Sequence, residues 1–571
     1  MCGIVGVFGT SPDRAKALAA RVLGDLSSRG PDAVTLAATT TGAIGAARLR
    51  ISDPAAPDQP MTTPDGAFRL ALNGEIWNDR DLRRRLQAGG ARFATACDTE
   101  TVLHAVAAAG PDAPQMLDGQ FAYIAQDMRT GQVHAARDPF GICPLWRAHL
   151  PDGGLILASS IAPILDAGAH PGTLRALPQG HSLSFHPASG KVTLRRYSDS
   201  GLAEPHGRPD PADPQALLAH LATTIRRRIP AEVPYATITG GIDSSLVTAI
   251  CQTAHRPPTC TITVAACAAD TPDIDNARQL QAAYGTRALV GRVDADFIRD
   301  ALPLVIERLA SAQYLVVLSS LVALKAARMA REAGAKVILT GGGADELFGG
   351  YTYLWTLFDR AQLAANLSHI LRQTGAHECH REDAIIAATG IEPRPAYFDL
   401  PLARAVAATP PEARIRGLGS ARVTEKALLK AAARRLPGFP PEIVARRKAP
   451  FYRSTAIAEL FETVAAEMLP PAERDAWIAR HIRGTAWESM MFGGRTGPVL
   501  VHKLFCERFP GLAAAPLRLR PPDYGDPDDY GRYAPNLGAP ALDGFSPVAA
   551  ARQAEAQGNA PSPAVTLHGG F

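Results

Sequence analysis

The spacing of apolar residues and glycines changes near residue 235, and this change restricts the folds open to the chain. Before it, short stretches of alternating apolar and polar residues are bounded by glycine, which is typical of strands joined by tight turns. After it, each short apolar stretch is followed by a glycine turn and a helical repeat, which predicts parallel strands with helical crossovers. We therefore expect an α+β unit followed by an α/β unit.

The same patterns predict individual elements and boundaries. In the first unit we expect strands at 3–9, 42–49, 68–76, 121–127 and 155–160, with helices at 15–26 and 101–109. In the second we expect strands at 236–239, 260–264, 288–293 and 336–339, with helices at 244–251 and 274–284 and two more before the last strand. Prolines at 205, 209, 211 and 214 indicate a linker. We place the units at 1–200 and 215–520, the linker at 201–214, and a tail rich in proline and glycine at 521–571.

Composition excludes several classes of function. A chain of 571 residues with 46% apolar and 20% charged residues is typical of a globular protein with more than one domain. Lysine and arginine number 59 against 55 acidic residues, and arginine runs such as 83–85 lie in helical patterns, so we expect no nucleic-acid partner. The eight cysteines form no Cys-x-x-Cys pair, which favours a cytoplasmic location over a disulfide framework or a zinc site. We also expect no signal peptide and no membrane span, because no apolar stretch is long enough.

Cys2 is the first candidate catalytic residue. Removal of Met1 would place its thiol beside a free α-amine, whose pKa of about 7.7–8.0 suits a base for a thiol of about 8.5. An inert buried cysteine would be the commoner role. Cys2 is, however, accompanied by four stretches that place polar groups at predicted strand ends or turns: Arg29-Gly30-Pro31-Asp32, Arg48-Leu49, Leu72-Asn73-Gly74-Glu75-Ile76-Trp77-Asn78 and Cys97-Asp98-Thr99-Glu100.

After a Met-Cys-Gly start, these stretches together resemble the glutaminase domain of class II glutamine amidotransferases, over about residues 1–195. The resemblance implies the αββα sandwich of N-terminal-nucleophile (Ntn) hydrolases, with L-glutamine as substrate. It implies that Cys2 attacks the side-chain amide, while Asn73 and the Gly74 N–H form the oxyanion hole. Arg48 would pair with the α-carboxylate of glutamine, and Glu75 and Asp98 would hold its α-amine. The implied glutamine site consists of Arg48, Ile51, Asn73, Gly74, Glu75 and Asp98.

A second group of candidate residues follows the predicted strand 236–239. The stretch Thr239-Gly240-Gly241-Ile242-Asp243-Ser244 leads into a helix, and its glycines, hydroxyls and helix N-terminus suit an anion. A plain glycine turn that caps a helix would have the same residues. The stretch lacks the Gly-Lys-Ser/Thr ending of a Walker P-loop and resembles instead the pyrophosphate loop of ATP pyrophosphatases, usually Ser-Gly-Gly-x-Asp-Ser. Because a carboxylate cannot bind phosphate directly, we assign Asp243, together with Asp345, to a bridging Mg²⁺.

Two later stretches extend the resemblance. Residues 381–399 and 446–451 are similar to the asparagine synthetase patterns Arg-x-Asp-x-x-x-Met-Ala-x-Gly-x-Glu-x-Arg-x-Pro-Phe-x-Asp and Arg-x-Lys-x-x-Phe. Over about residues 1–510 the chain resembles glutamine-dependent asparagine synthetases, which implies ATP, an ammonia channel, and a homodimer by analogy. Lys448 would neutralise charge on an acyl-adenylate or pyrophosphate. The implied ATP site consists of Ile238, Thr239, Gly240, Gly241, Asp243, Ser244, Val264, Thr340 and Gly341.

The stretch 338–351 departs from that family at one position. The family pattern is Ser-Gly-Glu-Gly-Ala/Ser-Asp-Glu-Leu-Phe-Gly-Gly-Tyr, and Gly342 stands where the family has glutamate. In the first hypothesis, the acid that receives the nitrogen is aspartate, and Glu346, Glu392 or water replaces the carboxylate that the family has at position 342. In the second, the acid is a larger one from a specialised pathway, and Gly342 makes room for it. A third hypothesis is a silent synthetase half in a glutaminase or an ATP-binding partner. The presence of Asp243, Asp345 and Lys448 favours the first two.

Overall fold

The computed structural model describes residues 1–513, apart from 201–212, 267–269, 352–353, 355–359, 419–422, 450–453, 486–487 and 489–494. Most of the predicted linker and all of the predicted tail therefore lie outside the described residues. Helix α5 (Pro214–Arg226) already begins at the last position that we assigned to the linker. Asp213 caps it by accepting a hydrogen bond from the Gln215 N–H at 2.9 Å, and proline is well suited to the first helical turn.

Two antiparallel sheets form the first unit. Their strand orders are β10-β8-β9-β1-β3-β2 and β12-β11-β7-β6-β5-β4. The first sheet contains β1 (Gly3–Phe8), β2 (Ala33–Thr39), β3 (Gly42–Arg48), β8 (Trp146–His149), β9 (Leu155–Ala158) and β10 (Arg175–Ala176). The second contains β4 (Met61–Thr62), β5 (Phe68–Ile76), β6 (Gly119–Asp127), β7 (Val133–Arg137), β11 (His181–His186) and β12 (Lys191–Arg196). The five expected strands are present as β1, β3, β5, β6 and β9, and the rest were not predicted.

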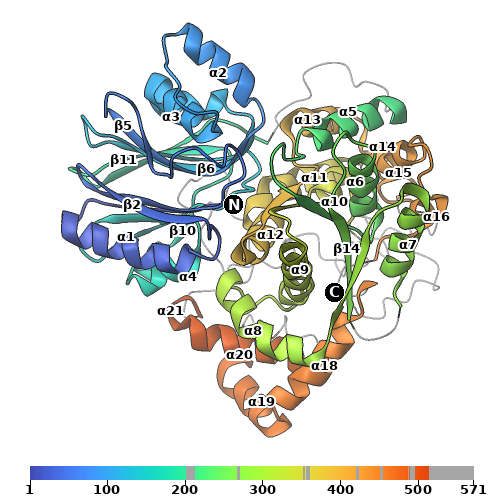
Figure 1. The fold of residues 1–571 in the computed structure, drawn as a ribbon. Helices are drawn as coiled ribbons and strands as arrows, with labels where there is room; N and C mark the ends of the chain where they lie inside the picture. The colour runs from blue at the N-terminus through green and yellow to red at the C-terminus, as the bar shows by residue number, and fades with distance from the viewer. Residues whose placement is uncertain are drawn as a thin grey trace.

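Helices cover the outer faces of both sheets, so that this unit has four layers (Figure 1). Helices α1 (Pro12–Leu26) and α4 (Ile161–Asp166) lie on the first sheet. Helix α3 (Asp98–Ala109) lies on the second, with α2 (Asp79–Ala88) against it. Between the sheets, Ile4 and Phe8 share one apolar cluster with Ile124. This arrangement confirms the predicted αββα sandwich.

The second unit is built on a parallel sheet with the order β15-β14-β13-β16-β17. Its strands are β13 (Tyr235–Ile238), β14 (Cys260–Ala266), β15 (Ala288–Val293), β16 (Val337–Thr340) and β17 (Glu392–Pro395). The crossovers contain α6 (Ile242–Gln252), α7 (Pro272–Tyr284), α8 (Ala295–Leu309) and α9 (Tyr314–Glu332). The strand order reverses between β13 and β16, and the carboxyl ends of strands at such a point are where α/β sheets bind ligands.

The strand β17 was not predicted. Pro393 and Pro395 lack the N–H groups of a central strand, but β17 lies at the edge of the sheet, where prolines are tolerated. Pairing with β16 places Glu392 beside Val337 and Arg394 beside Leu339. The strand thus brings two buried charged residues to the edge that faces the first unit.

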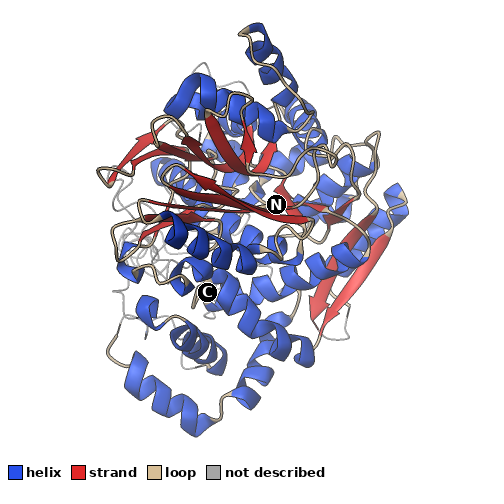
Figure 2. Ribbon diagram, turned by 60° about the vertical axis from the view of Figure 1, so that its left-hand side comes forward, coloured by secondary structure: helices blue, strands red, loops and turns tan. Residues whose placement is uncertain are grey.

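Further helices complete the second unit (Figure 2). They include α10 (Ala344–Phe348), α11 (Arg360–Gln373), α12 (Glu378–Ile386), α13 (Leu400–Ala407), α14 (Pro411–Arg414), α15 (Ala427–Ala433), α16 (Pro441–Ala445), α18 (Ile457–Met468), α19 (Pro471–Trp477), α20 (Thr496–Arg508) and α21 (Pro510–Ala513). In the described part of the chain no single helix has the length and hydropathy of a membrane span; α8 and α9, bent by 114°, pass that test together by length and composition only.

Helix α12 and strand β17 contact the first unit through charged side chains. Arg29 donates two hydrogen bonds to the Asp383 carboxylate, at 2.6 and 2.9 Å. Arg394 donates one to the Glu75 carboxylate at 2.8 Å. Arg29, Asp383 and Arg394 are all buried, so these pairs are shielded from solvent. The two segments lie between the candidate sites of the two units.

Candidate active sites

The first candidate site surrounds Cys2, the residue that precedes β1. Because Gly3 pairs with Ala47 in the first sheet, Cys2 lies beside the end of β3. That strand ends at Arg48, and Leu49 follows it. The Cys2 side chain is buried, and this burial raises the pKa of its thiol, while the positive α-amine of Met1 acts in the opposite direction. Cys2 is thus a buried residue just before the start of β1, beside the end of β3.

Met1 also occupies a defined place. Its α-amine lies 3.2 Å from the Glu392 carboxylate of β17, and its side chain is buried. While Met1 is present, the nitrogen of Cys2 is a peptide amide and cannot act as a base. Removal of Met1, which the predicted mechanism requires, would convert this amide to a free amine within the same buried surroundings, which include Glu392 and Arg48.

Asn73 and Gly74 of β5 have the features of an oxyanion hole. Asn73 is fully buried, and among the described residues neither its side-chain nitrogen nor its oxygen has a hydrogen-bond partner. Such orphaned groups are rare in folded proteins and call for a ligand or another explanation. Gly74 has φ +142°, and a Cβ there would lie 2.0 Å from the Gln120 carbonyl oxygen. The neighbouring strand β6 therefore admits only glycine at this position.

The residues predicted to bind glutamine differ in how they are already engaged. Arg48 is buried and donates hydrogen bonds to the carbonyl oxygens of Ala56 at 2.6 Å and Asp53 at 3.1 Å. Its guanidinium therefore shapes the loop at 53–58, a role that the sequence did not indicate. Ile51 is buried in an apolar cluster that also contains side chains of the second unit.

The two predicted amine-binding acids are buried. Asp98 accepts a hydrogen bond from the Ile76 N–H at 3.0 Å, and burial, reinforced by the charge of Asp79, raises the pKa of Asp98 to about 7. Burial raises the pKa of Glu75 to about 8, although the bonded Arg394 guanidinium lowers it. An arriving ammonium group would stabilise the ionised form of both carboxylates.

Replacement of Asn73 by alanine is expected to reduce kcat for glutamine hydrolysis by ~10²–10³-fold, the usual cost of losing one oxyanion-hole donor. Because the side-chain nitrogen and oxygen of Asn73 bond to no described residue, the variant loses no hydrogen bond within the described structure, and we expect its Tm to change little. Glutaminase kinetics and thermal unfolding on the same preparation measure both effects.

Gln126 of β6 provides the matched control. It is a buried amide in the same sheet, but its Nε2 donates to Gly131 O at 2.8 Å. Gln126→Ala should therefore lower stability by ~1–3 kcal/mol and leave hydrolysis intact. A large Tm loss with unchanged kcat in Asn73→Ala would assign that residue to structure instead.

The second candidate site lies where β13 and β16 end side by side. Gly241 is the N-cap of α6, and among the described residues no atom would contact a Cβ built on it, so the turn is open for a ligand to approach. Gly341 is different, because a Cβ there would lie 2.9 Å from the Ser244 N–H nitrogen. The two glycine turns are thus packed against each other, as the predicted nucleotide site requires.

The other residues of the predicted ATP site line the same turns. Thr239 is buried, its N–H donates to Ile262 O at 2.9 Å, and Asn276 Nδ2 donates to Gly240 O at 2.6 Å. Ser244 Oγ donates to Gly241 O at 3.3 Å. The remaining positions are Ile238, Val264 and Thr340, at or near the ends of β13, β14 and β16.

Asp243 and Asp345 meet beyond these turns, together with two lysines. Lys426 ion pairs with both carboxylates, and Lys448 Nζ lies 2.7 Å from Asp345 and 3.7 Å from Asp243. Burial would raise the pKa of Asp345, but the ammonium groups of Lys426 and Lys448 hold it well below its ordinary value. The same two carboxylates hold the pKa of Lys448 above its ordinary value against the effect of burial.

The carboxylates also fit the predicted Mg²⁺. Asp243 Oδ1 is buried and accepts no hydrogen bond from any described residue, so it has capacity for a ligand. The described residues contain no group of three or more His, Cys, Asp or Glu side chains that could hold a metal. Mg²⁺ commonly takes only one or two carboxylates when phosphate oxygens complete its shell. The pair therefore suits Mg²⁺ that arrives with a nucleotide.

Sequence reasoning missed Lys426 and its neighbour Glu425. Lys426 has a left-handed backbone conformation at the start of α15, with φ +50°. Glu425 accepts hydrogen bonds from the Lys448 N–H at 2.8 Å and from Lys430 Nζ at 2.7 Å, which holds the segment that carries Lys448. A lysine next to a glutamate is common on exposed helices, so no local pattern could distinguish this buried pair.

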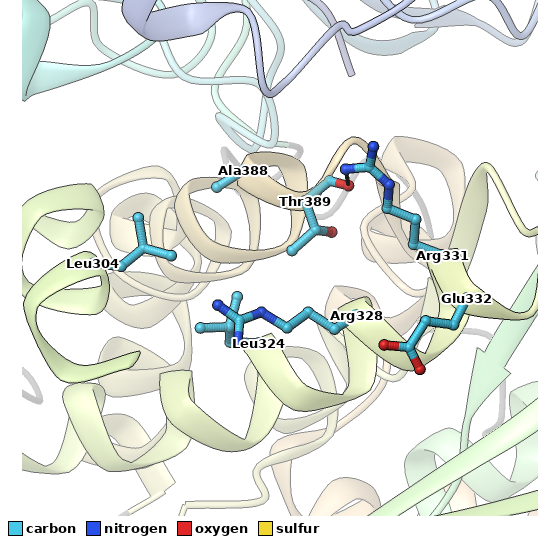
Figure 3. A pocket seen from close by; sticks show the side chains of 7 residues that line it. All are labelled: Leu304, Leu324, Arg328, Arg331, Glu332, Ala388 and Thr389. Atoms are coloured by element: carbon cyan, nitrogen blue, oxygen red, sulfur yellow. Dashed lines mark hydrogen bonds between the residues drawn. The ribbon is translucent and has the colours of Figure 1, made fainter. Parts of the chain in front are cut away.

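A cavity of about 230 Å³ lies elsewhere, between α8, α9 and the short helical turn Ala387–Thr389 (Figure 3). Its lining consists of Leu304, Leu324, Arg328, Arg331, Glu332, Ala388 and Thr389. Arg331 points to the turn and donates to Thr389 O at 2.8 Å. None of the predicted site residues lines it, so it belongs to neither candidate site.

Two family models match different parts of the chain. A family model described as "Glutamine amidotransferase domain" matches residues 1–186, and one described as "Asparagine synthase" matches 216–376 and 355–489. An asparagine synthetase (glutamine-hydrolysing) of Asparagus officinalis is 28% identical over 79% of this chain and 77% of its own. A probable asparagine synthetase of Schizosaccharomyces pombe is 29% identical over 70% and 74%. The solved glutamine phosphoribosylpyrophosphate amidotransferase from B. subtilis is 17% identical, covers 60% of this chain and 82% of its own, and has a TM-score of 0.30.

Proposed function

Since the chain belongs to the family of glutamine-hydrolysing asparagine synthetases, which are glutamine-dependent ligases, we propose that it joins the amide nitrogen of L-glutamine to an acyl-adenylate. The acyl-adenylate is made from ATP and a carboxylic acid, with release of pyrophosphate. The products are an amide, AMP and glutamate. The observation that carries this proposal is the partly buried Lys-Asp cluster at the ends of β13 and β16, in one chain with Cys2 and with Asn73, whose side chain has no hydrogen-bond partner among the described residues.

In the first half-reaction, the Cys2 sulfur adds to the side-chain amide carbon of glutamine. The amide nitrogen takes up a proton and leaves as ammonia, and water then releases glutamate from the thioester. Asn73 Nδ2 and the Gly74 N–H would stabilise the oxyanion of each tetrahedral intermediate. Both donors are placed by β5, whose register with β6 pairs Asn73 with Ala122.

In the second half-reaction, a carboxylate oxygen attacks the α-phosphorus of ATP and pyrophosphate leaves. The turn at 239–244, which is open beside Gly241, supplies backbone N–H groups and space for the phosphates. Lys426 and Lys448 neutralise the negative charge that develops on the phosphates. Mg²⁺ held by Asp243 and Asp345 would add further neutralisation when bound. Ammonia then displaces AMP from the acyl carbon.

The segment between the sites supports the transfer of ammonia inside the protein. Glu392, Arg394 and Glu75 form a chain of ion pairs, with separations of 2.8 and 2.8 Å, and while Met1 is present its α-amine lies 3.2 Å from Glu392. Asp383 of α12 binds Arg29, whose Nε also donates to Cys2 O at 3.3 Å. Two segments of the second unit thus touch the surroundings of Cys2.

The acceptor that we propose is aspartate, as for the named relatives. The alternative, a larger acid accommodated at Gly342, depends on free space beside that residue. A Cβ on Gly342 would lie 2.8 Å from Pro395 Cβ and 3.1 Å from a Glu382 carboxylate oxygen, so the position is already crowded. This crowding favours aspartate over an acid that extends into that space.

The proposal is tested by incubating the chain with ATP, Mg²⁺, glutamine and single acids, namely L-aspartate, L-glutamate, succinate and malonate. We expect pyrophosphate release and asparagine with L-aspartate, and much less with succinate, which lacks the amino group. An amide of another acid would replace aspartate as the acceptor. Glutamine hydrolysis with no nucleotide turnover in any mixture would support the third hypothesis, a silent synthetase half.

A further inference from the structure

Helix α12 carries a buried carboxylate to the end of β16. Glu382 is 7% exposed, and its Oε2 accepts a hydrogen bond from the Thr340 hydroxyl at 2.9 Å. The Thr340 hydroxyl in turn accepts one from the Gly342 N–H at 3.2 Å. The carboxylate is therefore attached to the turn that follows β16, which belongs to the proposed nucleotide site.

Gly342 is required by this carboxylate. A Cβ at this position would lie 3.1 and 3.2 Å from the two Glu382 oxygens, closer than nearly all Cβ contacts. It would also lie 2.8 Å from Pro395 Cβ in β17. The backbone of Gly342 does not have positive φ, so side-chain space and not backbone conformation excludes other residues. Glu382 of α12 therefore occupies the space beside the turn after β16, and the absence of a side chain at Gly342 makes this possible.

The second carboxylate oxygen of Glu382 has capacity to spare. Among the described residues Oε1 accepts no hydrogen bond, and Arg381 Nη2 lies 3.9 Å away while bound to Glu378. Burial, and then the charge of Glu378, raises the pKa of Glu382 to about 7, against the effects of Arg381 and Thr340. No charged group described on the packed elements α8, α9 or β17 contributes to this shift. The carboxyl group can therefore gain and lose a proton near neutral pH.

We propose that Glu382 is a catalytic residue that accepts the proton released when ammonia adds to the acyl-adenylate. This role rests on the proposed function. The nitrogen lone pair forms the new C–N bond, and the carbonyl electrons move to oxygen. One N–H proton passes to the Glu382 carboxylate, and collapse of the intermediate breaks the bond to AMP. The products are the neutral amide, AMP and a protonated Glu382, which returns its proton to solvent.

The test is Glu382→Gln, which keeps an acceptor for the Thr340 hydroxyl but cannot take up a proton. Two steps are measured in the full chain with ATP, Mg²⁺ and the acid that supports pyrophosphate release. Exchange of labelled pyrophosphate into ATP, without a nitrogen source, reports adenylation, and ammonium chloride supplies the second step. We expect exchange within about threefold of the parent and amide formation reduced by ~10²-fold or more.

The pH profile separates catalysis from structure. At a fixed concentration of free ammonia, amide formation by the parent chain should rise with pH to a plateau, because only ionised Glu382 accepts a proton, with a midpoint near 7. This rise should vanish in Glu382→Gln. The matched control is Glu378→Gln, an acid one turn earlier on α12. It should retain the rate within a few-fold and move the midpoint to lower pH, because Glu378 raises the pKa of Glu382.

Equal loss of exchange and amide formation in Glu382→Gln would overturn the proposal and indicate a structural role. A parental rate or an unchanged pH profile in that variant would overturn it as well, while leaving the proposed function intact. If the parent chain forms no amide with any acid of the panel, both proposals are wrong.

Discussion

Cys2→Ala is expected to abolish glutamine hydrolysis, with a loss of at least ~10⁴-fold in kcat/KM, because no other nucleophile can form the thioester. Amide formation from ammonium chloride should remain within about threefold of the parent, since the acyl-adenylate is made at the ends of β13 and β16. The measurements are glutamate release from glutamine and amide formation with each nitrogen source.

Cys143→Ala is the matched control for this variant. Cys143 is fully buried in the same unit, with its sulfur 3.7 Å from Met1 Sδ, and burial raises the pKa of its thiol well above the ordinary value. We expect hydrolysis to be retained, because such a thiol is a poor nucleophile. Mass spectrometry of the active protein should also show a chain that begins at Cys2. Parental hydrolysis by Cys2→Ala would show that the first candidate site is misassigned.

Lys448→Met is expected to reduce pyrophosphate release by ~10³-fold or more, because preorganised positive charge at a developing anion is among the largest contributions to catalysis. Its removal also leaves Asp345 with Lys426 as its remaining described ion-pair partner. Glutamine hydrolysis should persist, since Lys448 contacts no residue of the first unit in the described structure. Initial rates of pyrophosphate and glutamate release on one sample measure both.

Lys336→Met controls for the general loss of a lysine. Lys336 Nζ lies 2.7 Å from Asp32, and its side chain is 35% exposed, so we expect both rates to change by less than about threefold. If Lys448→Met released pyrophosphate as fast as Lys336→Met does, the Lys-Asp cluster would not be the nucleotide site.

The order of the two units could be predicted from local patterns, whereas the residues of both candidate sites were predicted from the resemblance of their motifs to known families. Alternation bounded by glycine placed β1, β3 and β5, and strand-glycine-helix patterns placed β13 and β16. Strands as short as β4 and β10, with two residues each, have no period that a pattern can reveal. The edge strand β12 has only two apolar residues, Val192 and Leu194, on its inner face, and so short an alternation was not recognised as a strand.

The residues that local patterns could not place are those whose role depends on distant partners. Asn73 and Gly74 could be proposed from the sequence because the stretch Leu72–Asn78 resembles a known family pattern. Glu382, Lys426 and Arg394 are ordinary charged residues in sequence. They become parts of the sites only because α12, α15 and β17 bring them to the first unit or to the sheet ends.

Gly342 shows most clearly what the sequence determines and what only the tertiary structure determines. The sequence shows that the turn after β16 has a glycine at position 342. From the sequence alone, this glycine suggests free space for a substrate. The folded structure shows Glu382 and Pro395 against that glycine, from segments 40 and 53 positions away by residue number. Local periodicity and glycine spacing determine the elements, because they act over a few residues. The position of the Glu382 carboxylate beside the turn after β16 depends on packing between elements distant in sequence, so only the tertiary structure determines it.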